Sequence, residues 1–251
     1  MSCVNIRGCC IGEGRPKVII PIVEPTETAV LEKAAEFSTL RADCVEWRID
    51  CFEGAKNLPA IVHCAAKLRV ALKDKLLLFT FRTKAEGGKV ALAHEEYLHF
   101  IRTVLATDCA DLIDIEFFTV GAELPALIEE ARTAGAAVVC SSHDFHKTPP
   151  RAELVSRMVA MQRAGADLPK LAVMPQSRAD VLELLAATAE MADRHPETPI
   201  ITMSMGALGA VSRLSGEALG SAMTFANPGQ ASAPGQVSLD VVNEVLDALH
   251  L

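Results

Sequence analysis

This chain of 251 residues has few aromatic side chains and a deficit of positive charge. Phe, Trp and Tyr make up 4% of the residues, whereas hydrophobic residues make up 50%. The core must therefore be mainly aliphatic, which suits a parallel sheet that helices cover on both faces. The 24 Lys and Arg residues face 32 Asp and Glu residues, for a net charge of −8. This balance argues against non-specific nucleic-acid binding, which needs a basic surface.

Several signals of other protein classes are also missing. No run approaches the roughly 18 apolar residues of a membrane helix, and the N-terminus lacks the basic start and long apolar stretch of a signal peptide. We therefore expect a cytoplasmic protein that does not bind a membrane. The eight cysteines form no CxxC pair and no Cys/His cluster with zinc-finger spacing. Cys44 and Cys140 lie in apolar runs, so we expect reduced core residues there.

Short apolar runs alternate with longer amphipathic stretches along the chain. Eight runs have the Val-, Ile-, Leu- and Phe-rich composition of buried parallel strands, and these are Val18–Val23, Cys44–Ile49, Leu76–Phe81, Leu112–Phe117, Ala137–Cys140, Leu171–Met174, Ile200–Met203 and Ala222–Phe225. Capping and first-turn residues predict helices from Thr26 to Leu40, after Pro149-Pro150, from Ser177 to about Ala192, and from about Ser238 to Leu249.

Eight such units without a dividing linker predict a single α/β domain over residues 1–251. We expect a (β/α)8 TIM barrel that follows a short N-terminal lead-in ending at Gly12-Glu13-Gly14. An open doubly wound sheet is the alternative, but no GxGxxG follows the first strand.

Charged residues inside the strand patterns are the first functional signal. Glu46, Arg48 and Asp50 alternate along one strand and so share a face, which must point into the barrel. Buried charges are costly unless they are paired or bind a ligand. Asp114 and Glu116 repeat this pattern, either as ligands of a divalent metal or as partners for basic residues. We favour the partner interpretation, with Arg48 and Lys170 as the partners.

Lys170 and His143 are the candidate catalytic residues. Lys170 is the only charge in the apolar segment Leu168–Pro175, and burial beside arginines favours the uncharged amine that attacks a ketone. His143 follows the apolar run that ends at Cys140, and imidazole both takes and returns a proton near neutral pH. A lysine that reaches solvent and a capping histidine are the corresponding structural alternatives.

Further polar residues follow other predicted strands, at the end where barrel enzymes carry their sites. Arg82 closes one strand and is suited to carboxylate or hydroxyl recognition. Glu86 lies in the Gly-rich loop that follows, and Arg213 lies in a short helical stretch after Met203-Ser204-Met205-Gly206. The small, polar segment from Asn227 to Gln236 predicts a mobile lid in which Ser232 and Gln236 form hydrogen bonds.

Together these residues resemble the type I 3-dehydroquinate dehydratases, a family of Schiff-base enzymes of the shikimate pathway. The matching segments span nearly the whole chain in the expected order, and they are Glu46–Asp50, Phe81–Gly88, Ser142–Phe145, Pro169–Ala172, Met203–Gly206, Arg213 and Ser232–Gln236. One position departs from the pattern: some members have a serine at the end of the first barrel strand, where this chain has Pro21. Any contact with substrate there is absent or made by the backbone.

The resemblance implies a homodimeric carbon–oxygen hydro-lyase that needs no metal and no organic cofactor. Lys170 would form an imine with 3-dehydroquinate, and His143 would remove the adjacent C–H proton and protonate the departing hydroxyl, giving 3-dehydroshikimate. Glu86 would orient His143, and Arg213 would hold the substrate carboxylate. The remaining residues would contact hydroxyls and ring edges, and these are Glu46, Arg48, Arg82, Ser232 and Gln236.

Three other functions use overlapping residues. A class I aldolase also uses a barrel lysine, but its sugar-phosphate substrates call for a Gly-rich phosphate cup, of which Gly206 and Gly209 are only a weak sign. A metal-dependent hydrolase would use His143, His146, Asp114 and Glu116 as ligands. A binding barrel without catalysis is disfavoured by the presence of Lys170, His143 and Glu86 together.

Overall fold

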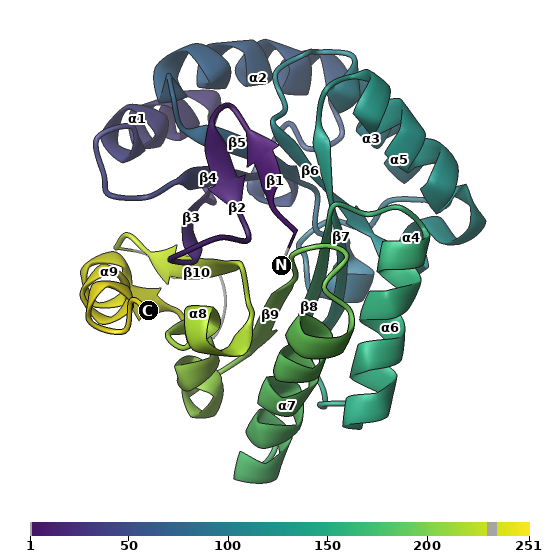
Figure 1. The fold of residues 1–251 in the computed structure, drawn as a ribbon. Coiled ribbons are helices and arrows are strands. Elements are labelled where there is room, and N and C mark those ends of the chain that lie inside the picture. Colours follow the sequence, from purple (N-terminus) through teal and green to yellow (C-terminus); the bar gives the residue numbers. More distant parts are fainter. Residues whose placement is uncertain (1, 230–234) are drawn as a thin grey trace.

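The computed structural model describes residues 2–229 and 235–251, in which strands and helices alternate along the chain (Figure 1). Nine strands of the described residues form one parallel sheet in the order β11-β10-β3-β4-β5-β6-β7-β8-β9. Their bounds are β3 Lys17–Ile22, β4 Cys44–Arg48, β5 Leu76–Thr80, β6 Leu112–Glu116, β7 Ala137–Asp144, β8 Leu168–Val173, β9 Ile201–Ser204, β10 Met223–Asn227 and β11 Val237–Ser238.

The sheet curls until its first and last long strands meet. A parallel bridge joins Ile200, just before β9, to Ser221, just before β10. The Ala222 N–H also donates to the Ile200 carbonyl at 2.8 Å. Strands β3 to β10 therefore close a TIM barrel, and the predicted (β/α)8 fold is confirmed, with all eight predicted strands present.

Helices follow the strands and cover the outside of the sheet (Figure 1). Their bounds are α1 Glu27–Phe37, α2 Leu58–Leu72, α3 His94–Leu105, α4 Phe117–Val120, α5 Leu124–Thr133, α6 Arg151–Arg163, α7 Arg178–Arg194, α8 Gly216–Leu219 and α9 Leu239–Ala248. Short 3-10 helices are η1 Ile49–Cys51, η2 Lys84–Glu86, η3 Gly121–Glu123 and η4 Ala207–Arg213. The predicted caps are confirmed: Thr26 accepts a hydrogen bond from the Ala29 N–H, and Ser177 accepts one from the Asp180 N–H, each at 3.3 Å.

Two strands extend three or more residues beyond the prediction at one end. β7 was expected to end at Cys140, but it continues to Asp144, so His143 lies inside the strand instead of just past it. The extra residues stay paired with β8, with Ser141 opposite Lys170 and His143 opposite Ala172. A polar strand end is possible here because the barrel interior holds partners for these side chains. β8 begins at Leu168, so Lys170 is also a strand residue.

The lead-in forms a β-hairpin that the sequence did not predict. β1 (Val4–Ile6) pairs antiparallel with β2 (Cys9–Ile11), and a disulfide joins Cys3 to Cys10. Ile11 is fully buried and packs with Ile19, Leu76 and other residues of the barrel interior. The hairpin therefore closes the amino end of the barrel, in front of the strands in Figure 1. Cys44 and Cys140 are buried free thiols, as predicted.

A second layer of core lies between the strands and the helices. The only tryptophan, Trp47, is fully buried there and makes edge contacts with Phe52 and Phe79 at centroid distances of 5.7 and 5.8 Å. Such pairs add to the free energy gained by burying the rings. Outward-facing Trp47 alternates with the inward-facing Glu46 and Arg48, so packing on one face of β4 fixes the position of charges on the other.

Replacing Phe79 by Ala should lower the free energy of unfolding by about 3–5 kcal/mol, because the change leaves a cavity beside Trp47. Urea unfolding followed by Trp47 fluorescence measures the loss. Val70→Ala on α2 is the control, since Val70 is 78% exposed, and it should stay within about 0.5 kcal/mol of wild type. A loss of less than about 1 kcal/mol for Phe79→Ala would contradict this packing.

Candidate active site

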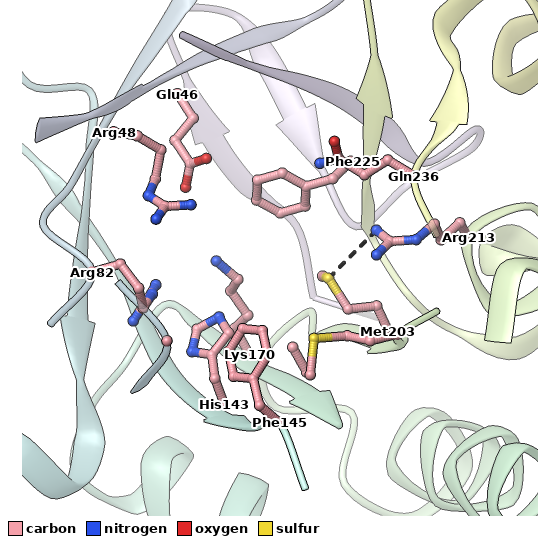
Figure 2. A pocket seen from close by; sticks show the side chains of 13 residues that line it. Glu46, Arg48, Arg82, His143, Phe145, Lys170, Met203, Arg213, Phe225 and Gln236 are labelled. Carbon is pink, nitrogen blue, oxygen red and sulfur yellow. Dashed lines mark hydrogen bonds between the residues drawn. The ribbon is translucent and has the colours of Figure 1, made fainter. Parts of the chain in front are cut away.

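A cavity of about 200 Å³ opens at the carboxyl ends of the barrel strands. This volume is below the range of drug-sized ligand sites and suits one compact ring. Seven of the nine predicted site residues line it, and they are Glu46, Arg48, Arg82, His143, Lys170, Arg213 and Gln236 (Figure 2). The eighth, Glu86, contacts His143. The ninth, Ser232, lies outside the described residues.

Lys170 projects from β8 into this cavity and is 3% exposed. Its Nζ donates to Asp114 Oδ2 at 3.0 Å, so the predicted partnership of these two residues is confirmed. The same Nζ lies 4.7 Å from the centre of the Phe225 ring, a distance at which a cation is attracted by the ring face. These contacts hold the amine at a defined point of the cavity.

Glu86 fixes the orientation of the His143 ring through two contacts. Nδ1 lies 2.8 Å from Glu86 Oε2, and the His143 backbone N–H donates to the same oxygen at 3.1 Å. Nδ1 is engaged in this contact, so proton transfer with a ligand falls to Nε2. The expected proximity of Glu86 and His143 is therefore present, and the ring orientation follows from it.

Burial shifts the pKa values of both His143 and Glu86. It lowers the pKa of His143 well below 6.5, and the positive charges of Arg82, Lys170 and Arg48 act in the same direction. Burial also raises the pKa of Glu86 to about 8, although the charge of Arg82 opposes the rise. Near neutral pH the imidazole is therefore uncharged, which is the form that acts as a base.

Behind Lys170 lies a buried cluster of charges around Arg82. Its guanidinium donates to Asp114 at 2.7 Å, to Glu116 at 2.9 Å and to Ser141 Oγ at 3.0 Å. Burial alone would raise the pKa of Asp114, but the charges of Arg82 and Lys170 outweigh it and hold that pKa at about 2. Arg82 therefore lines the cavity while most of its donors serve the protein itself.

The prediction that Arg48 is a partner of Asp114 or Glu116 is wrong. Its guanidinium contacts Asp50, with Nε to Oδ1 at 2.8 Å and NH2 to Oδ2 at 2.9 Å. The reason is strand order: β5 separates β4, which carries Arg48, from β6, which carries both acids. Arg82 directly follows β5 and so reaches β6. The neighbouring Glu46 is 3% exposed and accepts a hydrogen bond from Thr80 Oγ1 at 2.8 Å.

Arg213 forms the opposite wall of the cavity (Figure 2). It is 1% exposed, its NH1 lies 3.7 Å from Met203 Sδ, and its backbone carbonyl accepts a hydrogen bond from Thr224 Oγ1 at 2.8 Å. Burial lowers its pKa to about 10, so it stays charged at neutral pH. A guanidinium in such a place suits a ligand carboxylate.

Gln236 reaches the cavity through a close approach of backbone segments. A Cβ at Gly235 would lie 2.1 Å from the Gly206 carbonyl oxygen, and Gly235 has φ +73°. Position 235 therefore requires glycine. The close approach of Gly235 to Gly206 brings Gln236 beside the start of η4. Pro21, the residue that departs from the family pattern, instead lines a separate small hollow with Ile22 and Pro228.

Some residues of the cavity wall were not predicted as site residues. Phe145, Met203, Met205 and Phe225 line part of the wall, and their apolar character resembled ordinary core. Ser141, which contacts Arg82 and Asp114 behind the cavity, could have been found, because it alternates with His143 along β7 and so shares its inward face.

The residues proposed for a metal-dependent hydrolase are not gathered into one site. Among the described residues, the one group of at least three His, Cys, Asp or Glu with ligand atoms within 4.8 Å of one another is Cys3, Cys10 and Glu13. That group lies at the hairpin, where the two cysteines form the disulfide. Asp114 and Glu116 instead have protein donors, and His146 is exposed.

Comparisons with known proteins find similar proteins over nearly the whole chain. The family model of type I 3-dehydroquinase matches residues 18–251. The 3-dehydroquinate dehydratase of Bacillus subtilis is 47% identical over 250 residues, which cover 100% of this chain and 98% of that protein. The enzyme of the same name from Salmonella typhimurium is 44% identical, with 100% and 99% covered.

Solved structures give the same result. The type I 3-dehydroquinate dehydratase of Clostridium difficile, solved with covalently modified comenic acid, has a TM-score of 0.96 and 42% identity, covering 99% of this chain and 98% of that one. The 3-dehydroquinate dehydratase of Enterococcus faecalis has a TM-score of 0.93 and 40% identity, covering 99% and 100%.

Replacing Arg82 by Met should destabilise the fold by about 3–5 kcal/mol at pH 7, because buried carboxylates lose their cation. In wild type, the lowered pKa of Asp114 stabilises the fold above pH 3.8, and this contribution is lost as the pH falls toward 2. In the variant, Asp114 loses the charge of Arg82 that keeps it ionised and gains from protonation, so the loss of stability should be smaller at pH 4 than at pH 7. Urea unfolding at several pH values measures it.

Arg102→Met is the matched control, because Arg102 pairs with Glu130 at the surface with 43% of its side chain exposed. It should cost no more than about 1 kcal/mol, with little dependence on pH. Equal losses for both variants would contradict the role assigned to Arg82.

Proposed function

Because this chain belongs to the type I 3-dehydroquinase family, we propose that it dehydrates 3-dehydroquinate to 3-dehydroshikimate through an imine on Lys170. It is a carbon–oxygen hydro-lyase of the shikimate pathway. The observation that carries the mechanism is the pairing of a buried amine with an uncharged imidazole in one cavity (Figure 2). A class I aldolase would use the same lysine, but the family relationship favours the dehydratase.

The charges of the cavity orient the substrate. Arg213 receives the carboxylate on one wall, while Glu46 and Arg48 contact hydroxyls on the other, with Lys170 between them (Figure 2). Gln236 adds a hydrogen-bonding amide at the rim, and Ser232 joins it in our proposal although it lies outside the described residues. Arg82 acts mainly through its contacts with Asp114 and Glu116 and presents its remaining surface to the ligand.

Imine formation begins when the uncharged amine of Lys170 attacks the substrate ketone. A C–N bond forms, and the ketone oxygen leaves as water after proton transfer. The product is an iminium cation whose nitrogen is the Nζ atom of Lys170. Asp114, whose carboxylate lies 3.0 Å from Nζ and has a pKa of about 2, stays ionised and is the counter-ion of this cation.

His143 performs both proton transfers. The iminium withdraws electrons and acidifies the neighbouring carbon, so Nε2 of His143 removes a proton there and an enamine forms. The enamine electrons then expel the β-hydroxyl, which takes the proton back from His143 and departs as water. Hydrolysis of the conjugated imine releases the product and restores Lys170. Glu86 orients the ring throughout, since Nδ1 stays in contact with its carboxyl.

We also propose that the chain is a single domain that functions as a cytoplasmic homodimer without metal or organic cofactor. The family resemblance supports this state. Among the described residues, no helix combines the length and apolar character needed to span a bilayer. Sedimentation equilibrium measures the oligomeric state, and activity in the presence of a chelator measures the need for metal.

Sodium borohydride added during turnover should reduce the imine and leave a stable adduct on Lys170, because reduction removes the C=N bond that hydrolysis needs. Peptide mass mapping locates the adduct. Lys170→Met should give none, whereas Lys67→Met, at a residue paired with Glu27 on the surface, should behave as wild type. An adduct on a different lysine would refute the mechanism.

Replacing His143 by Ala should lower kcat by about 10²–10⁴-fold while borohydride still traps the imine. The lowered pKa of His143 adds a second expectation: the acid limb of the wild-type profile of kcat/KM should lie below pH 6.5, since the base stays unprotonated down to its own pKa. The absorbance of the conjugated product measures both. Normal turnover of the variant would exclude His143 as the base.

A further inference from the structure

Glu116 ends β6 behind the cavity, and the mechanism above gives it no step. It is fully buried, and its two carboxylate oxygens accept four hydrogen bonds. Oε1 accepts from the Thr83 backbone N–H at 2.8 Å and from Arg82 at 2.9 Å. Oε2 accepts from the hydroxyls of Thr83 and Thr119, each at 2.7 Å. Three of the four donors are uncharged groups.

These contacts hold the first residue of a tight turn. The Thr83 carbonyl accepts from the Glu86 N–H at 3.0 Å and from the Gly88 N–H at 2.8 Å, so Thr83 organises the turn that contains η2. The turn is compact, because a Cβ at Gly88 would lie 1.8 Å from the Arg82 carbonyl oxygen. A shift of Thr83 therefore moves Glu86.

Glu86 in turn positions His143, through the 2.8 Å contact to Nδ1 and the hydrogen bond from the backbone N–H. We propose that Glu116 is a positioning residue of the dehydratase reaction, which sets the place of Glu86 and through it the orientation of the His143 imidazole. This inference rests on the proposed function of His143 and extends it by one residue.

A role as mere counter-charge for Arg82 does not account for the contacts of Glu116. Asp114 already binds that guanidinium at 2.7 Å, and a counter-charge needs neither the backbone N–H nor the hydroxyl of Thr83. The turn is also held from its other side, where Asp50 accepts from the N–H groups of Arg82 at 3.3 Å and Lys89 at 3.2 Å. Glu116 binds the turn at Thr83, whose carbonyl accepts the hydrogen bond from the Glu86 N–H.

The charge of Glu116 provides a readout that a purely structural residue lacks. The groups that act on the Glu86 carboxyl are Arg82, whose charge lowers its pKa, Glu116 and Asp114, whose charges raise it, and the His143 N–H, which lowers it. Removing the charge of Glu116 should therefore move the titration of Glu86 to lower pH.

The test uses Glu116→Gln, which keeps the shape but removes the charge and the acceptor at one terminal atom. We expect kcat to fall about tenfold or more, because small misplacements of catalytic groups are costly, with KM changed less than about twofold and the imine still trapped on Lys170. The titration of the Glu86 carboxyl should move to lower pH, and the profile of kcat/KM should change with it because Glu86 contacts His143.

Asp111→Asn is the matched control. Asp111 immediately precedes β6 and is also a largely buried acid, with hydrogen bonds from the Leu77 N–H at 2.8 Å and from Arg69 at 2.5 Å. This variant loses a comparable buried ion pair at the opposite end of the same strand. It should lose stability while it keeps the wild-type pH profile. A pH profile of Glu116→Gln that matches the profile of Asp111→Asn would overturn the proposal.

If Glu116→Gln does not fold, the variant Thr83→Val tests the proposal instead. It removes the hydroxyl that donates to Glu116 and keeps every charge. It should lower kcat severalfold with unchanged imine trapping, and a wild-type kcat would overturn the proposal. The imidazole ¹⁵N resonances of His143, recorded without substrate, separate this inference from the proposed function. They should change in Glu116→Gln and stay unchanged in Asp111→Asn even if 3-dehydroquinate is not the substrate, and identical spectra would again overturn the proposal.

Discussion

The balance of charge inside the barrel is the constraint on which the rest of the site depends. Arg82 and Lys170 face Asp114 and Glu116 in a region almost closed to water. Each charge there would be costly alone, and the set is tolerated because two cations meet two carboxylates with several short hydrogen bonds. Strand order brings these residues together, since β5, β6, β7 and β8 are successive neighbours in the sheet.

This balance also explains the protonation state of His143 and Glu86. Arg82 contacts Glu86 at 3.5 Å but also pairs with Asp114 and Glu116 at shorter distances, so it offsets an added charge on Glu86 only in part. The charges of Arg82, Lys170 and Arg48 disfavour an added positive charge on His143. Burial therefore keeps both groups near neutrality, with the pKa of His143 lowered and that of Glu86 raised. An uncharged base beside Lys170 fits a reaction in which a proton is removed from the carbon next to an iminium.

Much of the fold was readable from the sequence, because buried parallel strands are short aliphatic runs and helices carry recognisable caps. Lys170 was readable as well, as a single charge in an apolar strand. The ion pairs were harder to predict. Alternation indicated that Arg48, Asp114 and Glu116 point inward, but periodicity does not say which strands are neighbours. The acids were therefore assigned to Arg48 instead of Arg82. The hairpin was missed because three-residue strands have too little pattern, and β7 was cut short because its last residues are polar.

The hairpin has a further consequence for how molecules move through the enzyme. Since β1 and β2 cover the amino end of the barrel and Ile11 fills its floor, the cavity has a dead end behind Lys170. Substrate, product and the water that is released must all share the opposite mouth. The next substrate can therefore enter only after the product has left, and a product molecule that stays in the cavity blocks it. A compound that only blocks this opening would stop entry and exit alike without contacting Lys170.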